Sequence, residues 1–334
     1  MRYVIIGAGA VGGTIGGRLA QAGREVVLVA RGAHLEALRR EGLRLVTPGG
    51  AETLRLPAVG GAAELGALLP GDVLVLAVKS QDTAAALTEW AALPGAQDTP
   101  VVCAQNGVSN ERTALRLFPQ VVAACVWLPA THLEPGVVVS HTAPLSGILT
   151  LGQYPGGVGA FTEQIASDLV AAGFDAPVAP DAMRWKYGKL LNNLGNALEA
   201  LLGRDGLAGN EDLYLAVREE GERVLTAAGI DWATDEERMA VQADRMDVRP
   251  IPGYGRVGGS TWQSLSRGTG SVEADHLNGE IALLARLHGT VAPLNAQLQR
   301  LVRQFAAEGR APGSLTAAGL RELPAQESGQ AATR

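Results

Sequence analysis

The first twenty residues constrain the fold more than any other part of the sequence. An apolar run, Tyr3–Ile6, leads into Gly7–Gly12 (GAGAVG), and helix-forming residues follow to Ala20. This is the GxGxxG pattern between a strand and a helix, which is typical of a Rossmann-type α/β fold. The pyrophosphate of a dinucleotide would lie at the N-terminus of that helix, where free N–H groups and the helix dipole favour anions. The predicted cofactor-binding residues of this loop are Gly7, Ala8, Gly9, Ala10, Val11 and Gly12.

The second predicted strand, Glu25–Val29, ends just before Arg31. A site for NAD usually has an acidic residue here that binds the ribose hydroxyls, whereas an arginine accommodates the 2′-phosphate of NADP. Arg31 therefore favours NADP as the cofactor. The alternative is an arginine that simply lies on the surface after a strand.

Two polar positions follow the next buried strands. Asp72–Val78 ends at Lys79, and Pro100–Ala104 leads into Asn106-Gly107. Ligands of an open α/β sheet bind at the carboxyl ends of the strands. We therefore predict that Lys79 contributes to the cofactor site and that the Asn106 amide contacts the nicotinamide or the substrate. Alternatively, Lys79 is a solvated loop residue and Asn106-Gly107 only a turn.

Strand and helix patterns alternate to about residue 178. A further strand is expected over Val121–Leu128, and short strands over Val137–Ser140 and Ile148–Leu151 are expected to extend the sheet. After residue 180 helical periods dominate. The sequence thus predicts a doubly wound Rossmann-type sheet in residues 1–178, an all-helical second domain in residues 179–310 and a flexible tail over residues 311–334.

One predicted helix, Arg184–Gly203, has an unusual polar face. At 100° per residue its leucines fill one arc. The opposite arc contains Lys186, Lys189, Asn192, Asn193 and Asn196. Because Asn costs roughly 0.6 kcal/mol relative to Ala in a helix, a face that meets only water would more often carry Glu, Lys, Arg or Gln. We interpret the arc as a set of donors and acceptors that faces a cleft; a solvated face is the alternative.

Composition restricts the possible partners. The chain has 334 residues and a formal charge of −6, which argues against nucleic acid or an anionic membrane as a partner. No uninterrupted apolar run reaches the ~20 residues of a membrane span. Cys103 and Cys125 form no close-spaced metal or redox motif, so a cytoplasmic setting is expected. His132 and His141 lack ligand-like spacing to acidic or cysteine residues, and no metal site is predicted.

Together these features resemble the ketopantoate reductase (2-dehydropantoate 2-reductase) family. The resemblance spans roughly residues 1–305 and includes Ser260-Thr261, which stand thirteen and twelve residues before Glu273. It implies a Rossmann domain, a helical domain that binds the substrate and can form a homodimer, and NADPH-dependent reduction of a 2-oxo acid in pantothenate biosynthesis. Carried over by position, it implies catalytic roles for Lys189, Glu273 and Asn106. The implied substrate-binding residues are Asn193, Asn196 and Thr261, and we add Asn192 from the polar arc and Ser260, whose hydroxyl suits a substrate carboxylate.

In this interpretation Lys189 stabilises the negative charge that grows on the carbonyl oxygen as hydride arrives, and delivers the proton. On the helical wheel Lys189 lies between Asn193 and Asn196, whereas Lys186 lies at the edge of the arc. Lys186 is therefore expected to help bind an anion or to stay solvated; the alternative is that Lys186, and not Lys189, is the proton donor. Glu273 would orient the lysine or accept a hydrogen bond from a substrate hydroxyl. The alternative is that Glu273 lies in the first turn of a helix starting near Ser271, where the helix dipole stabilises an acidic residue.

Some positions depart from the family pattern. Trp185 lies four residues before Lys189 instead of two, and Asn196 lies seven residues after it instead of eight. Ala197 and Ser264 stand where the family usually has proline and aspartate. These differences bear on the substrate more than on the reaction type.

The alternative functions are a reductase of another oxo acid or an imine on the same fold, and a non-catalytic NADP-binding sensor. A sensor would need none of Lys189, Asn193 and Glu273, so their joint presence argues for an enzyme.

Overall fold

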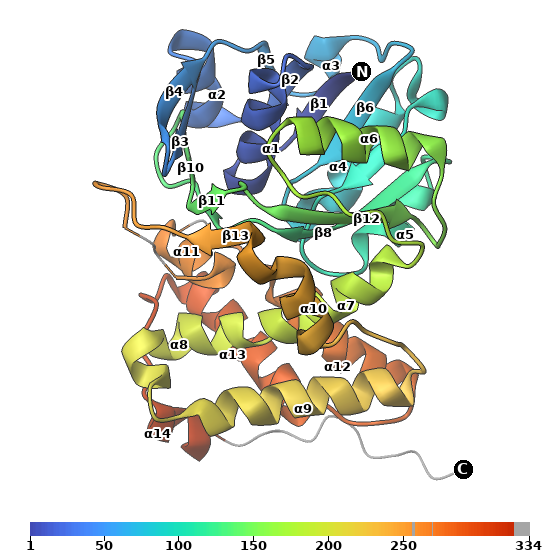
Figure 1. Ribbon diagram of the computed structural model, residues 1–334. Helices are drawn as coiled ribbons and strands as arrows, with labels where there is room; N and C mark the ends of the chain where they lie inside the picture. The colour runs from blue at the N-terminus through green and yellow to red at the C-terminus, as the bar shows by residue number, and fades with distance from the viewer. Residues whose placement is uncertain (256–257, 269, 324–334) are drawn as a thin grey trace. The chain divides into compact units, whose positions relative to one another are not determined.

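The computed structural model describes residues 1–255, 258–268 and 270–323, and it divides into two compact units (Figure 1). The first unit comprises Met1–Lys186 together with a segment that begins at Ala233. The second comprises Tyr187–Trp232 together with the described residues from 258 onward. This division differs from the predicted one, because residues 179–186 and the segment from Ala233 belong with the first unit.

The first unit is built on a seven-stranded sheet with the order β12-β8-β7-β6-β1-β2-β5. Strand β1 (Arg2–Ile6) lies between β2 (Glu25–Val29) and β6 (Asp72–Leu76) and pairs in parallel with both. Strand β12 is antiparallel to β8, whereas the other neighbours are parallel. The remaining strands of the sheet are β5 (Ala58–Val59), β7 (Val101–Cys103), β8 (Val121–Trp127) and β12 (Ile148–Gln153).

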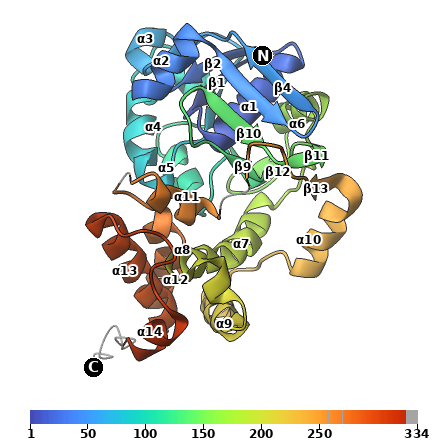
Figure 2. The ribbon, with the colours of Figure 1, turned by 90° about the vertical axis from the view of Figure 1, so that its left-hand side faces the viewer.

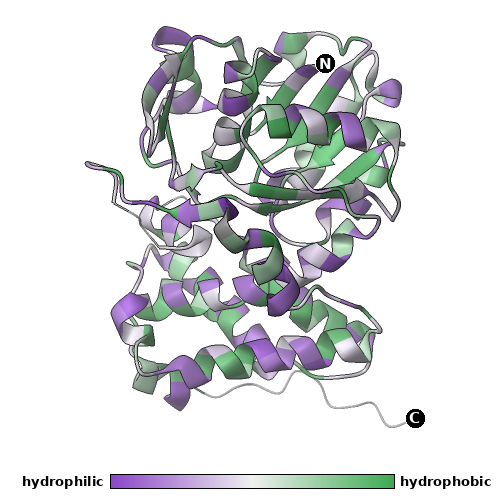
Figure 3. Cartoon of the chain, viewed as in Figure 1, coloured by the Kyte–Doolittle hydropathy of each residue, from purple (hydrophilic) through white to green (hydrophobic). Residues whose placement is uncertain are grey.

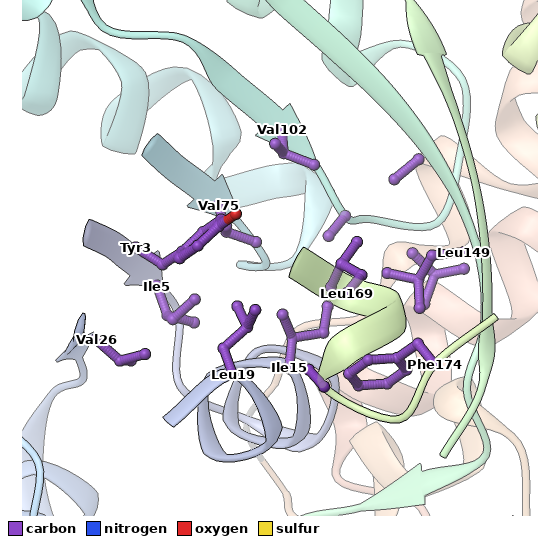
Figure 4. Close-up of a cluster of buried hydrophobic side chains, with 14 of the residues drawn as sticks. Tyr3, Ile5, Ile15, Leu19, Val26, Val75, Val102, Leu149, Leu169 and Phe174 are labelled. Carbon is purple, nitrogen blue, oxygen red and sulfur yellow. The ribbon is translucent and has the colours of Figure 1, made fainter. Parts of the chain in front are cut away.

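Both faces of this sheet are buried, which explains its nearly continuous apolar strands (Figure 3). Alternate residues of β1 enter opposite cores, Tyr3 and Ile5 on one side and Val4 and Ile6 on the other. Helices α1 (Ala10–Gln21) and α6 (Ala160–Ala171) cover the first side (Figure 4). Helices α4 (Thr83–Ala91) and α5 (Asn110–Leu115) cover the second. The predicted doubly wound α/β fold is confirmed.

The short elements beside this sheet include helix α2, which follows β2. Their bounds are α2 (Gly32–Arg40), α3 (Ala62–Leu65) and the 3-10 turns η1 (Ser80–Asp82) and η2 (Ala96–Asp98).

A second sheet of four strands has the order β4-β3-β10-β9. The prediction that Val137–Ser140 extends the main sheet is wrong: this segment is β10, which pairs in parallel with β3. Helix α1 packs on this sheet as well. A Cβ at Gly13 would lie 2.7 Å from a Val138 methyl group, so the glycines of α1 allow close packing. The other strands of this sheet are β3 (Leu43–Thr47), β4 (Gly50–Leu54) and β9 (Ala130–Thr131).

The segment that starts at Ala233 returns to the first unit through a strand pair and an ion pair. Strand β13 (Met246–Val248) pairs with β11 (Thr142–Pro144), about a hundred residues earlier in the chain. Helix α10 (Asp235–Gln242) carries Glu237, which accepts two hydrogen bonds from the Arg184 guanidinium, of 2.8 and 2.9 Å. This contact holds the pKa of Glu237 at about 2.

The second unit contains helices and no strand among its described residues. Helix α9 illustrates how the helices of this unit pack together. Val217, Gly221, Val224 and Leu225 recur at helical spacing and are buried, while the opposite side is polar (Figure 3). Helices α12 and α13 lie side by side (Figure 2). The helices are α8 (Gly195–Leu207), α9 (Glu211–Ala227), α11 (Ser260–Ser266), α12 (Asn278–Leu287), α13 (Pro293–Glu308) and α14 (Ala317–Glu322).

The predicted helix Arg184–Gly203 is divided in the structure. Helix α7 (Ala182–Asn193) crosses from one unit into the other, α8 follows after Leu194, and Gly203 at φ +73° departs from helical geometry. The leucines of the predicted arc are buried, with Leu191 and Leu201 each fully enclosed.

Two further predictions concern the C-terminal tail and membrane-spanning segments. The predicted tail from residue 311 contains α14, and residues 324–334 of that tail lie outside the described residues. Across the described ranges, the helices are too short or too polar to cross a membrane.

Candidate dinucleotide and oxo-acid site

The glycine loop has the backbone geometry that a pyrophosphate requires. At Gly7 φ is +99°, and a Cβ there would lie 2.8 Å from the Val78 nitrogen. A Cβ at Gly12 would lie 2.2 Å from the Gly7 carbonyl oxygen, whereas the space beside Gly9 is open to 4 Å. Helix α1 begins at Ala10 with no side-chain cap and no acidic residue in its first turn. Its first N–H groups can therefore bind phosphate oxygens.

His34 supports this loop from α2, a role that the sequence analysis missed. The Gly136 N–H donates to His34 Nδ1 (2.9 Å), so Nδ1 is unprotonated and Nε2 donates to the Ala8 carbonyl (2.8 Å). The ring packs against that of His132, with centroids 4.2 Å apart. Burial lowers the pKa of His34 below 6.5. No local pattern could reveal this contact, because its partners lie 26 and 102 residues away.

Arg31 lies where a residue that contacts the adenosine ribose of a dinucleotide is expected. It follows β2 directly and stands at the N-terminal boundary of α2. Its side chain is 75% exposed, and its guanidinium lies 3.7 Å from a carboxylate oxygen of Glu89. An exposed pair of this length contributes little, so the guanidinium can be redirected to a phosphate.

The carboxyl ends of β6 and β7 are joined by a buried polar network. Gln105 Nε2 donates to the Val78 carbonyl (2.7 Å) and to Thr83 Oγ1 (2.8 Å). Asn110 Nδ2 (2.9 Å) donates to the carbonyl of Asn106. Because β6 and β7 are neighbours, Lys79 and Asn106 follow adjacent strand ends, and both are half-buried.

Lys186 is neither solvated nor free to bind an anion, so the prediction for this residue is wrong. Its side chain is 2% exposed, and Nζ forms an ion pair with the Glu111 carboxylate. Nζ also donates to the Gln105 carbonyl at 3.0 Å. A charge taken from water needs a paired partner, and Glu111, on α5, supplies it. A helical wheel shows only which side of a helix a residue occupies. It could not show that Glu111 and Gln105, from other segments, enclose Lys186.

The other polar residues of the arc lie in the second unit. Lys189, Asn193 and Asn196 are half-buried there. Asn196 Nδ2 lies 3.5 Å from Ser260 Oγ at the start of α11, and Thr261 beside it is 3% exposed. The structure thus brings together an amide and the hydroxyl group that the sequence analysis assigned to one substrate.

Asn192 contacts a neighbouring helix. Its Nδ2 donates to the Gly188 carbonyl (3.0 Å), and Arg218 of α9 donates to its Oδ1 (3.2 Å). This amide therefore also links α7 to α9.

Glu273 lies in a 3-10 turn, η4 (Glu273–His276), and is half-buried. The predicted helix start near Ser271 is wrong, because α12 begins only at Asn278 after a non-helical Leu277. Glu273 is thus outside the first turn of α12, and the helix-dipole explanation does not apply to that helix.

Comparison with known proteins identifies relatives of the whole chain. The family model "Ketopantoate reductase PanE/ApbA" matches residues 3–156, and "Ketopantoate reductase PanE/ApbA C terminal" matches residues 181–306. The 2-dehydropantoate 2-reductase of Mesorhizobium japonicum is 33% identical over 92% of this chain and 98% of that protein.

Solved structures show the same similarity. A PanE/ApbA family ketopantoate reductase from Ralstonia eutropha JMP134 has a TM-score of 0.76 and 31% identity, over 93% of this chain and 100% of that one. D-mandelate dehydrogenase, solved as a ternary structure with NADH and anilino(oxo)acetate, also has a TM-score of 0.76 and covers the same shares. Its identity is 22%, so that likeness is one of fold alone.

Proposed function

The chain belongs to the ketopantoate reductase family, and we propose that it catalyses the NADPH-dependent reduction of 2-dehydropantoate to pantoate. The observation that carries this proposal is the match of both family models, which together extend from residue 3 to residue 306. The open backbone at Gly9 and the uncapped start of α1 support dinucleotide binding in this chain.

In the proposed reaction the bound nicotinamide supplies a hydride to the carbonyl carbon of the substrate. The carbonyl π electrons move to the oxygen, and we assign Lys189 to stabilise that oxygen and to give it a proton. Lys186 is less suited to this role, because its enclosed ammonium serves Glu111 and Gln105. The assignment to Lys189 therefore rests on the enclosure of Lys186 and on the place of Lys189 in the family pattern.

We assign substrate binding mainly to neutral polar side chains. Asn196 and Ser260, which lie within 3.5 Å of each other, and the neighbouring Thr261 can bind a carboxylate or hydroxyl without competing for the proton. Asn192 and Asn193 belong, like Asn196, to the polar arc that the sequence predicts. We keep both in the proposed set of substrate-binding residues. Glu273 can accept a hydrogen bond from a substrate hydroxyl.

The cofactor preference is the finer part of the proposal. We propose NADPH over NADH because Arg31 stands where an NAD site carries an acid, with Lys79 as a second positive charge near the strand ends. The exposed guanidinium of Arg31 makes only a 3.7 Å contact with Glu89, so a 2′-phosphate can compete for it.

The decisive experiment is an assay of NADPH oxidation with a panel of 2-oxo acids and cyclic imines that includes 2-dehydropantoate. Turnover of 2-dehydropantoate with a kcat/KM above that of the other compounds supports the proposal. A stronger response to another oxo acid or imine would assign the chain to a different reductase reaction. Binding of NADPH with turnover of none of them would favour a sensor. Sedimentation of the same sample tests the predicted homodimer.

A further inference from the structure

We infer that Lys186 and Glu111 are positioning residues that fix the conformation of Asn106 at the end of β7. This inference rests on the proposed function, because it takes Asn106 to contact the nicotinamide or the substrate. Neither residue of the pair is among the groups assigned to substrate or cofactor. Any effect of Lys186 and Glu111 on the reaction would pass through the backbone of Asn106, the residue that follows Gln105.

The first argument is geometric. Two peptide groups flank the Cα atom of Asn106, and buried side chains hold the carbonyl of each. Lys186 Nζ donates to the Gln105 carbonyl at 3.0 Å. Asn110 Nδ2 and Ser80 Oγ donate to the Asn106 carbonyl at 2.9 and 3.2 Å. Because each peptide group is planar, fixing both sets φ and ψ of Asn106, and with them the direction in which its side chain leaves the backbone.

The second argument concerns charge. The side chains of Lys186 and Glu111 are 2% and 0% exposed, so each would be strongly unfavourable without the other. An ammonium group has three donors, and one of them can serve the Gln105 carbonyl while another serves the carboxylate. A charged donor also binds a carbonyl more strongly than a neutral one. Glu111 therefore holds the Lys186 side chain in place, and Lys186 holds the peptide before Asn106.

The third argument concerns connection along the chain. Glu111 is on α5, directly after the Asn106 turn, whereas Lys186 is on α7 and is the last residue of the first unit. Lys189 follows three residues later on the same helix. The ion pair thus joins the turn that carries Asn106 to the part of α7 that belongs to the first unit.

The test is a double-mutant cycle that separates positioning from folding. Removing one charge leaves the other buried, so the variant used is Lys186→Met/Glu111→Gln, which removes both charges at similar volume. We expect its kcat/KM for 2-dehydropantoate to fall about 10- to 100-fold, as for a reacting group that is misplaced by about 1 Å. In an Asn106→Ala background the same two substitutions should cost less than about 3-fold, because the residue they position is gone.

The matched control is Arg2→Met/Asp72→Asn, which removes another ion pair of the same unit at the amino ends of β1 and β6. It should lower Tm and leave kcat/KM within about 3-fold of wild type at a temperature where both proteins are folded. Equal losses with and without Asn106 would show that Lys186 and Glu111 act only on the fold, and would overturn the inference. A fully active Asn106→Ala variant would overturn it as well.

Failure of the proposed function would give a different result. If the wild-type protein turns over no 2-oxo acid, the cycle is repeated with the dissociation constant of NADPH as the readout. Non-additive effects of the pair and Asn106 on NADPH affinity would then still support positioning. Additive effects would reject it.

Discussion

Lys186 and Lys189 lie almost one turn apart on α7, yet the structure gives them opposite surroundings. Lys186 is enclosed, with a carboxylate and a carbonyl as partners, whereas Lys189 is half-buried in the second unit. A related contrast separates His34, which is half-buried and held between two backbone groups, from Arg31, which is 75% exposed. A polar group whose partners lie within the protein acts mainly on stability and on its neighbours' positions, while an exposed group such as Arg31 is available to ligands.

The largest expected effect comes from an enclosed group. Lys186→Ala leaves the Glu111 carboxylate buried without its partner, and breaking such a pair costs about 3–5 kcal/mol. Urea unfolding should therefore show a much lower midpoint for this variant than for wild type. Unchanged stability would mean that Lys186 is not enclosed in solution, and the contrast with Lys189 would disappear.

Lys189→Ala should act on the reaction instead. We expect kcat to fall at least ~100-fold, the low end for loss of a general acid, because no group then protonates the forming alkoxide. NADPH affinity, measured by fluorescence titration, and the unfolding midpoint should stay near wild type. Near-normal turnover would remove Lys189 from the chemistry.

Arg31→Ala tests the open group of the cofactor site. Loss of a charge-assisted contact to the 2′-phosphate should weaken NADPH binding about 10- to 100-fold. NADH binding should hardly change, because NADH lacks that phosphate. Equal weakening of both cofactors would contradict the NADP assignment.

His34→Gln is expected to have the smallest effect, and the effect should depend on pH. Burial lowers the pKa of His34 in the folded protein below 6.5, so the unfolded chain binds the proton more readily. The contribution of neutral His34 to stability is complete above pH 6.5 and decreases as pH falls toward the lowered pKa. The difference in unfolding free energy between wild type and His34→Gln should therefore shrink with acidification below pH 6.5. A constant difference would show that His34 does not titrate in this way.

Features decided by neighbouring residues could be predicted from the sequence. The glycine loop is one, because the backbone conformation at Gly7 and the packing at Gly12 depend on the absence of a side chain at those residues. The buried strands and the leucine arc of α7 and α8 are others, since burial follows from a regular spacing of apolar residues. These local constraints were sufficient for the fold class, for the strand ends that carry Lys79 and Asn106, and for the family.

Other features depended on partners far along the chain, which only the tertiary structure decided. Lys186 is separated from Glu111 by 75 residues, and β13 from β11 by about a hundred. A charge must find a counter-charge when it is buried, and a strand must find an edge, but neither requirement states which segment will provide it. The sequence by itself determined what each residue could do locally; the fold decided that, of two lysines on one helix, Lys186 is enclosed with Glu111 and Gln105 as its partners.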